Sequence, residues 1–342
     1  MNKIHITMNY RLITYMLSVL LFIFPIHLVF IFLKNLLYDA GIIKPKSVSA
    51  KVISVGNISL GGTGKTPTTI AIANFLEKRG FSVGIVSRGH GRENLSNSFL
   101  VHNHSWRECG DEVILLKNNV SSKTHIFVSK DKVYAARKLA EIGCSIILLD
   151  DGFQHRRIHR DVDIVLLGPK DHNKKRKLIY PYGSLREPIC SLKRSDIIIS
   201  TKTNLIENKI DVFSDYTLSL DVKEELISKS PIKYVDDLSK CTDIISLSSI
   251  GDPASFAKTL KNIGIKVNKE LVFPDHWSFS ERDIEKINEI SKMEKLKKIV
   301  CTEKDYVKLL EFENLLTVDI CAVVLKHDLN QDIKEDILSR LS

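Results

Sequence analysis

Short apolar runs alternate with helix-like segments along most of the chain, and this alternation predicts parallel sheets covered by helices. A first series has strand-like runs at 52–55, 81–86, 146–149, 164–167 and 197–200, with helical patterns at 70–76 and 113–116. From about Ile206 the composition shifts toward Lys, Asp and Glu, and a second series follows, with strand-like runs at 244–247, 270–273 and 298–301 and helical patterns at 254–263 and 280–290. We therefore expect a doubly wound, mainly parallel α/β domain at 35–205 and a smaller α/β domain at 206–342.

An uncharged, mostly apolar run of 22 residues, Leu12 to Leu33, precedes both domains. As an α-helix it would extend about 33 Å, enough to cross the hydrocarbon core of a bilayer. Pro25 and His27 interrupt the run, so a kinked or interfacial helix and a buried helix of a soluble protein are the alternatives. A cleaved signal peptide is disfavoured, because the run is longer than a typical h-region. We expect residues 1–34 to form a membrane anchor.

Charge and cysteine usage narrow the class of protein. The 342 residues carry a formal net charge of +9, which favours an anionic partner: nucleic acid, a membrane surface or a phosphorylated substrate. Nucleic acid is disfavoured, because the basic residues are spread out without interleaved aromatic residues. The six cysteines form no C-x-x-C pair and no Cys/His cluster at zinc spacing, which indicates reduced thiols. The stretch from Lys170 to Lys177, with four lysines and an arginine, is a candidate contact for anionic headgroups.

The sequence VISVGNISLGGTGKTP, at 52–67, combines a strand, a glycine-rich turn and the start of a helix. Such a turn lets backbone N–H groups and the positive end of the helix face phosphate oxygens. In this P-loop arrangement Lys65 contacts the β and γ phosphates and the Thr66 hydroxyl contacts Mg²⁺. Ser59 stands where the usual pattern has its first glycine. The residues expected around the nucleotide are Gly61, Gly62, Thr63, Gly64, Lys65 and Thr66.

Polar residues follow other predicted strands, where open α/β sheets bind ligands. The apolar run 146–149 ends in Asp150 and Asp151, as expected for a Walker B element that binds a hard cation, although carboxylates that only cap the next turn are the alternative. The loop SRGHGR, at 87–92, suits an anion or is a solvated basic turn. Asp111 and Glu112 begin a helical pattern, where acids are commonly only helix N-terminal electrostatics.

In their order along the chain, these motifs resemble one family, the tetraacyldisaccharide 4'-kinases of Gram-negative bacteria. The resemblance covers nearly the whole chain and rests on the N-terminal hydrophobic helix and on VGNISLGGTGKTP, SRGHGR, GDE, LLDDGFQHRR, PYGSLREP, IGDP, FPDH and TEKD. It implies a kinase that uses ATP and Mg²⁺ to phosphorylate the 4'-hydroxyl of a membrane-embedded, acylated glucosamine disaccharide 1-phosphate in lipid A biosynthesis. The expected location is the inner membrane with the catalytic domains on the cytoplasmic side, in contact with membrane lipids and with no obligate protein partner.

The resemblance also implies roles for single residues. Asp111 and His276 would form the catalytic pair, helped by Lys65, and domain closure would bring the pair together because the two lie in different predicted domains. Asp150, Asp151 and Gln154 would bind the metal with Thr66. His90 departs from the Tyr that is more common in the family. The residues expected to meet the substrate are Arg88, His90, Glu112, His155, Arg186 and Glu187.

A function of a different class is the alternative: a membrane-tethered P-loop switch or assembly factor whose nucleotide state controls a partner. A guanine-reading N-K-x-D sequence does occur, from Asn208 to Asp211. The predicted strand at 197–200 ends well before it, however, which favours a chance match. A comparison of ATP and GTP binding separates the two functions.

Overall fold

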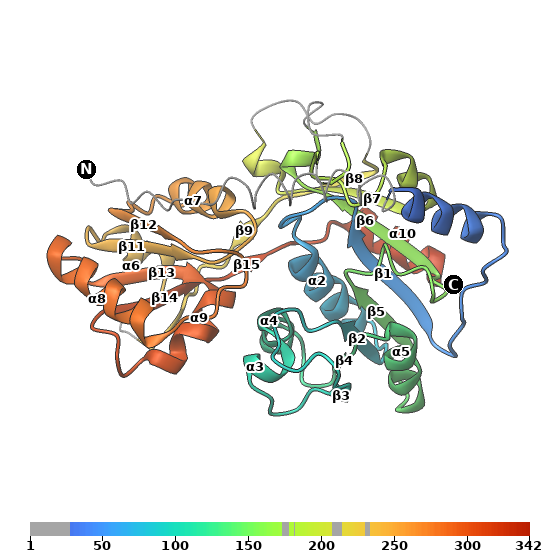
Figure 1. Ribbon diagram of the computed structural model, residues 1–342, viewed down its shortest axis with the longest axis horizontal. Helices are drawn as coiled ribbons and strands as arrows, with labels where there is room; N and C mark the ends of the chain where they lie inside the picture. The colour runs from blue at the N-terminus through green and yellow to red at the C-terminus, as the bar shows by residue number, and fades with distance from the viewer. Residues whose placement is uncertain (1–27, 173–177, 181, 207–213, 230–232) are drawn as a thin grey trace, which may run out of the picture.

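The computed structural model describes residues 28–172, 178–180, 182–206, 214–229 and 233–342, which form two α/β domains (Figure 1). Within these residues the larger sheet has eight strands. All neighbouring strands pair in parallel except the edge strand β3, which is antiparallel to β4. Their order is β3 (Phe99–Leu100), β4 (His125–Val128), β2 (Val83–Ser87), β5 (Ile146–Asp150), β1 (Lys51–Asn57), β6 (Val162–Leu167), β7 (Ile197–Thr201) and β8 (Tyr216–Leu218).

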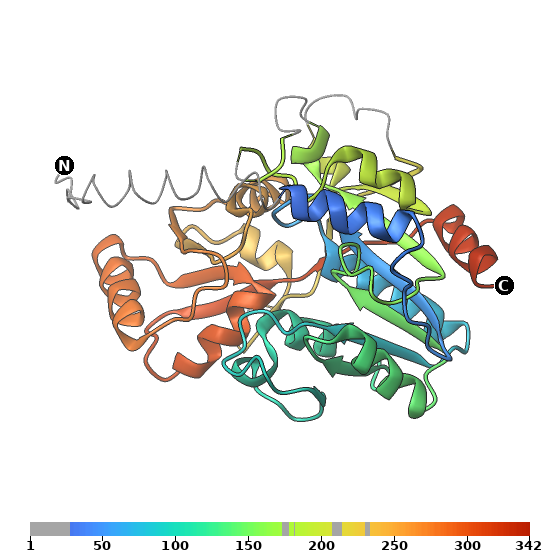
Figure 2. The same cartoon turned by 45° about the vertical axis from the view of Figure 1, so that its right-hand side comes forward.

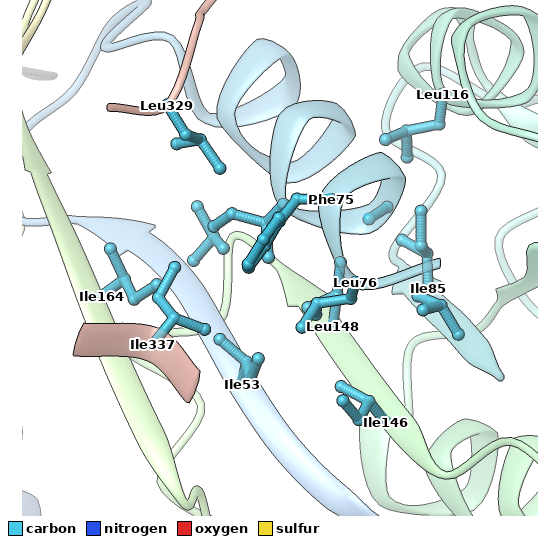
Figure 3. Close-up of a cluster of buried hydrophobic side chains, with 14 of the residues drawn as sticks. Ile53, Phe75, Leu76, Ile85, Leu116, Ile146, Leu148, Ile164, Leu329 and Ile337 are labelled. Carbon is cyan, nitrogen blue, oxygen red and sulfur yellow. The ribbon is translucent and has the colours of Figure 1, made fainter. Parts of the chain in front are cut away.

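Helices cover both faces of this sheet, because its strands are apolar on both sides. One face packs against α2 (Lys65–Lys78), α4 (Asp111–Asn119) and α10 (Gln331–Leu341). Figure 3 shows this core, where Phe75 and Leu76 of α2 meet Ile53 and Leu148 of the sheet. The other face packs against α5 (Lys132–Glu141). The predicted α/β class with a doubly wound, mainly parallel sheet is therefore confirmed.

The smaller sheet has five strands among the described residues, and only its edge strand β10 is antiparallel. Their order is β10 (Ile227–Ser228), β14 (Asp319–Val323), β13 (Lys298–Thr302), β11 (Ile244–Ser248) and β12 (Lys269–Val272). On one face lie α8 (Glu281–Glu294) and α9 (Glu303–Leu309), and on the other α6 (Val235–Ser239) and α7 (Pro253–Asn262). Shorter elements are α3 (Trp106–Cys109), η1 (Pro169–His172), η3 (Ile189–Arg194), η4 (Thr203–Leu205) and η5 (Leu310–Phe312).

The chain passes between the domains twice, through an antiparallel ribbon of β9 (Asp221–Val222) and β15 (Leu325–Lys326). Figures 1 and 2 show this ribbon between the two sheets, with α10 returning to the larger one. There Leu329, Ile333 and Ile337 enter the core that contains Ile53. The boundary at residue 206 stays a prediction; β8 and α10 follow it in the chain and yet pack with the larger sheet.

Most of the predicted membrane anchor lies outside the described residues. Residues 28–39, which include the end of the predicted anchor, form a helix. The polar side of this helix contacts the larger domain: Lys34 donates to the carbonyl of Gln154, and Asp39 pairs with Arg156. Within the described part of the chain, no helix is both long and apolar enough to span a bilayer. The N-K-x-D sequence at 208–211 and residues 173–177 of the basic stretch also lie outside the described residues.

His327, just after β15, fixes the glycine-rich loop to the ribbon. Its buried ring lies against Gly64, which has a left-handed φ of 83° and precedes α2. The Thr68 hydroxyl donates to the Gly64 carbonyl at 2.9 Å and lies 2.8 Å from His327 Nδ1. Since that hydroxyl has a single hydrogen, it accepts from Nδ1, which makes Nδ1 the protonated ring nitrogen. Burial lowers the pKa of His327 to about 3, so the ring stays neutral.

We predict that Gly64→Ala destabilises the protein by about 2–4 kcal/mol even without nucleotide, because left-handed φ is strained for alanine and a close-packed site does not absorb an added methyl group. The new Cβ would lie 2.5 Å from His327 Cε1. Thermal unfolding of the nucleotide-free protein measures the effect. Gly62→Ala is the matched control, since its nearest neighbour would be Lys202 Nζ at 3.8 Å. Equal melting temperatures for the two variants would contradict the steric argument.

Candidate active site

A cleft of about 940 Å³ lies between the two domains, at the carboxyl ends of the strands of both sheets. The larger domain contributes the glycine-rich loop, the start of α2, the loop after β2 and the end of β5. The smaller domain contributes the loops after β11, β12 and β13. Carboxyl ends of parallel strands are where open α/β sheets bind ligands, so the topology alone directs both sheets toward one site.

The start of α2 is built to meet an anion. Gly64 precedes it without any side-chain cap, so the first N–H groups of the helix face the cleft without an internal partner. Lys65 Nζ lies 3.4 Å from Asn57 Oδ1 and 3.7 Å from Asp151 Oδ1. Ser59, the departure from the usual pattern, donates its hydroxyl to Asp171 Oδ2 at 3.0 Å. The loop is therefore held by a side-chain contact that a glycine could not make.

Asp150 and Asp151, at the end of β5, have opposite electrostatic environments. Asp150 is 3% exposed, and burial followed by the charge of Glu112 raises its pKa to about 7. Its Oδ1 is buried and makes no hydrogen bond within the described residues. Asp151 is only partly buried, with its side chain 39% exposed. Desolvation opposes its charge, but nearby cations outweigh it and lower the pKa, Lys65 first and then Arg186, whose Nη1 lies 2.9 Å from Oδ2. An unpartnered carboxylate oxygen beside an ionised carboxylate is a donor set that suits a hard cation.

Asp111 and His276 meet across the two domains. His276 Nδ1 lies 3.0 Å from Asp111 Oδ2 and 3.1 Å from Oδ1. Burial opposes charge on Asp111, but the hydrogen bond to His276 and the charges of Lys304 and Lys308 outweigh it and lower the pKa of the carboxyl group. Burial likewise opposes charge on His276, and the contact with Asp111 raises the pKa of the imidazole. The pair is already in contact in this structure.

Other residues predicted to meet the substrate lie around this pair. Glu112 Oε1 accepts from Lys304 Nζ at 2.6 Å, and both line the cleft. His90 lies beside His276, with ring centroids 4.4 Å apart and planes tilted by 46°. Arg88 also lines the cleft and is exposed. A carboxylate, two imidazoles and a guanidinium thus surround the point where a second substrate could approach the glycine-rich loop.

Four predicted site residues do not line the cleft. One is Asp111, which is 3% exposed and contacts His276, a residue that does line the cleft. Gln154 donates its amide to the Asn57 carbonyl at 2.8 Å. Burial, with the charge of Lys132, lowers the pKa of His155 to about 4, and its Nε2 is buried without a hydrogen bond within the described residues. Glu187, 4% exposed, pairs with Arg194 at 2.8 Å. Their assigned roles stay predictions.

The structure also brings in lysines that the motifs do not include. Lys132 Nζ donates to the carbonyl of Asp151 at 2.8 Å and to that of Asp150, so it supports the turn in which Asp151 has a left-handed φ of 53°. Lys202 follows β7 with a φ of 57° and lines the cleft near Gly62, and burial lowers its pKa to about 8. Lys132 follows β4 and Lys202 follows β7. A lysine shortly after a predicted strand is the sequence signal by which both could have been found.

The family to which the chain belongs follows from sequence and structure comparisons. A family model described as tetraacyldisaccharide-1-P 4'-kinase matches residues 16–342. The tetraacyldisaccharide 4'-kinase of Aquifex aeolicus is 33% identical over 298 residues, 84% of this chain and 88% of that protein. The Koribacter versatilis enzyme is 35% identical over 263 residues, 74% of this chain and 77% of that protein. A crystal structure of LpxK from Aquifex aeolicus in complex with ATP aligns with a TM-score of 0.73 at 31% identity, covering 95% of this chain and 99% of that one. The chain belongs to the tetraacyldisaccharide 4'-kinase family.

Proposed function

We propose that the protein transfers the γ-phosphoryl group of ATP to the 4'-hydroxyl of a tetraacyl glucosamine disaccharide 1-phosphate, with Asp111 and His276 as the catalytic pair. The observation that carries this proposal is that one cleft is lined both by the open start of α2 with Lys65 and by His276, whose ring contacts the buried Asp111 at 3.0 Å. Membership of the family supports the reaction, and the geometry of the cleft supports the roles proposed for the residues.

In this mechanism the 4'-oxygen attacks the γ-phosphorus while the bond to the β,γ-bridging oxygen breaks, and ADP leaves. The ionised carboxylate of Asp111 accepts the proton of the hydroxyl, and His276 holds the carboxylate and shares the charge that develops. Lys65 and the N–H groups at the start of α2 stabilise the negative charge on the phosphates. Arg88 and His90 lie where they could position the sugar.

The residues present fit a magnesium ion. The buried Asp150 Oδ1 without a hydrogen bond, the Asp151 carboxylate and the Thr66 hydroxyl would hold it. Bound there, the ion would neutralise charge on the β and γ phosphates. Arg186 and Lys65 would then exchange part of their contact with Asp151 for contact with the triphosphate.

We also propose that the protein works on the cytoplasmic side of the inner membrane and that the helix at 28–39 contributes to its contact with the membrane. Five large apolar residues of this helix are about half exposed or more: Val29 at 62%, Phe30 at 65%, Phe32 at 68%, Leu33 at 49% and Leu36 at 50%. An exposed apolar face next to a longer apolar run supports contact with lipid. The basic stretch would add headgroup contacts, although Lys170 itself pairs with Asp252 at 2.9 Å.

We expect Asp111→Ala and Lys65→Ala both to abolish transfer of ³²P from γ-labelled ATP to a purified 1-phosphorylated tetraacyl disaccharide in detergent micelles. Loss of a general base lowers kcat by about 10²–10⁴-fold. Asp111→Ala should bind ATP normally, whereas Lys65→Ala should bind it more weakly. The matched control for Lys65→Ala is Lys78→Ala, at the exposed end of α2, and the matched control for Asp111→Ala is Asp319→Ala, exposed on β14.

Retention of most activity by Asp111→Ala would show that the base is another group. Failure of the intact protein to transfer phosphate while it binds nucleotide, with GTP preferred to ATP, would favour the tethered switch instead.

For the membrane contact, we expect the double variant Phe30→Glu/Phe32→Glu to lose at least about tenfold in binding to vesicles of phosphatidylethanolamine and phosphatidylglycerol. Each phenylalanine side chain that no longer inserts into the apolar part of the bilayer loses roughly 1.5–3 kcal/mol of transfer free energy. Met293→Glu is the control, since Met293 is 83% exposed on the smaller domain. Co-sedimentation of the full chain measures binding, and equal pelleting of both variants would contradict the proposed contact.

A further inference from the structure

Lys308 on α9 is a buried cation that joins the catalytic pair to the core of the smaller domain. Its side chain is 1% exposed. Nζ donates to Ser249 Oγ at 2.7 Å and to the carbonyl of Trp277 at 3.1 Å, and it pairs with Asp305 Oδ1 at 3.2 Å. Two of the three ammonium hydrogens are thus donated to neutral acceptors, and Asp305 is the charge partner of the group.

Asp111 is the fourth neighbour of the same ammonium group. Its Oδ2 lies 3.6 Å from Lys308 Nζ, and the carboxylate is only 3% exposed. Since Lys308 makes no hydrogen bond to Asp111 at this distance, Asp111 experiences the lysine chiefly as a nearby positive charge. Such a charge has a large effect in a site from which water is excluded, and it favours the ionised form of the carboxyl group.

Lys308 also fixes the backbone that carries His276. The His276 N–H donates to the Ser249 carbonyl at 3.1 Å, and Trp277 is the next residue in the chain. Lys308 therefore holds both sides of the turn through Ser249 and Trp277. His276 has a left-handed φ of 57°, a conformation that a histidine keeps only where its surroundings enforce it.

We propose that Lys308 is a positioning residue for phosphoryl transfer, which fixes the turn that carries His276 and keeps Asp111 in its proton-accepting form. This inference rests on the proposed function, because it takes Asp111 as the base. The titratable and charged groups around the pair come from four segments: Glu112 on α4, His90 in the loop after β2, Asp275 beside His276, and Lys304, Asp305 and Lys308 on α9.

The test is the pH dependence of kcat in Lys308→Met, measured with the full chain in micelles. A nearby cation lowers the pKa of both a carboxyl group and an imidazole, so its loss raises both. The acid limb of the profile should therefore move to higher pH, by roughly one unit, and kcat at its optimum should fall about tenfold while the KM for ATP stays within about twofold. An acid limb that keeps its wild-type position overturns the proposal, whatever the loss in kcat.

Three variants keep this result interpretable. Lys308→Met leaves Asp305, which is 0% exposed, without its cation, so Lys308→Met/Asp305→Asn removes both charges and should be folded by circular dichroism. Its acid limb should move in the same direction but less far, because loss of the Asp305 anion lowers the two pKa values in part. Lys308→Arg keeps the charge and should keep the wild-type limb. The control is Lys298→Met on β13, which breaks an ion pair with Asp243 and should leave the acid limb at its wild-type position.

A failure of the underlying assignment would look different. Asp111→Asn should lose transfer at every pH in the same assay. Full transfer by Asp111→Asn would overturn the catalytic pair and the role of Lys308 with it, whereas an unmoved limb in Lys308→Met overturns the role of Lys308 alone.

Discussion

The hydrogen bond between Asp111 and His276 is the contact on which the architecture of the site depends, because its two partners come from different domains. A separation of 3.0 Å requires that the carboxyl ends of both sheets face each other across the cleft. The ribbon of β9 and β15 sets this arrangement by carrying the chain across twice. Burial of Asp111 at 3% exposure makes the contact electrostatically strong, and it also makes the surrounding cations necessary.

Paired charges fill the cleft, and an anionic nucleotide would rearrange them. Asp151 now serves as the counter-ion of Lys65 and Arg186. A triphosphate offers these cations more negative charge, which would free Asp151 for a divalent ion. Asp150 contributes the complementary property: burial and the charge of Glu112 raise its pKa to about 7, so a bound cation would stabilise its charged form. Under the proposed mechanism, a metal ion and a nucleotide would therefore favour each other's binding.

Sequence reasoning predicted what depends on short stretches of chain. The run 146–149 followed by two aspartates gave a buried strand and its terminal carboxylates, and the glycine-rich turn gave the start of α2, because both are local patterns. Lys308 carries no such signal, since it meets Asp111 only through the packing of α9 against α4, far apart in the chain. The return of α10 to the larger core was missed for the same reason: its apolar stripe indicates burial but not the sheet that covers it.

Gln154 and Glu187 do not line the cleft, and both have a different physical role, which involves the helix at 28–39. Lys34 Nζ donates to the Gln154 carbonyl at 3.0 Å, and Asn35 Nδ2 donates to Glu187 Oε2 at 3.0 Å. Gln154 lies three residues after Asp151, and Glu187 directly follows Arg186. Because Asp151 and Arg186 form an ion pair inside the cleft, the helix touches the neighbours of both partners. The polar side of the helix therefore supports the two loops that carry this ion pair, while its apolar side is exposed. The position of the helix and the geometry of the Asp151 carboxylate are thus mechanically connected.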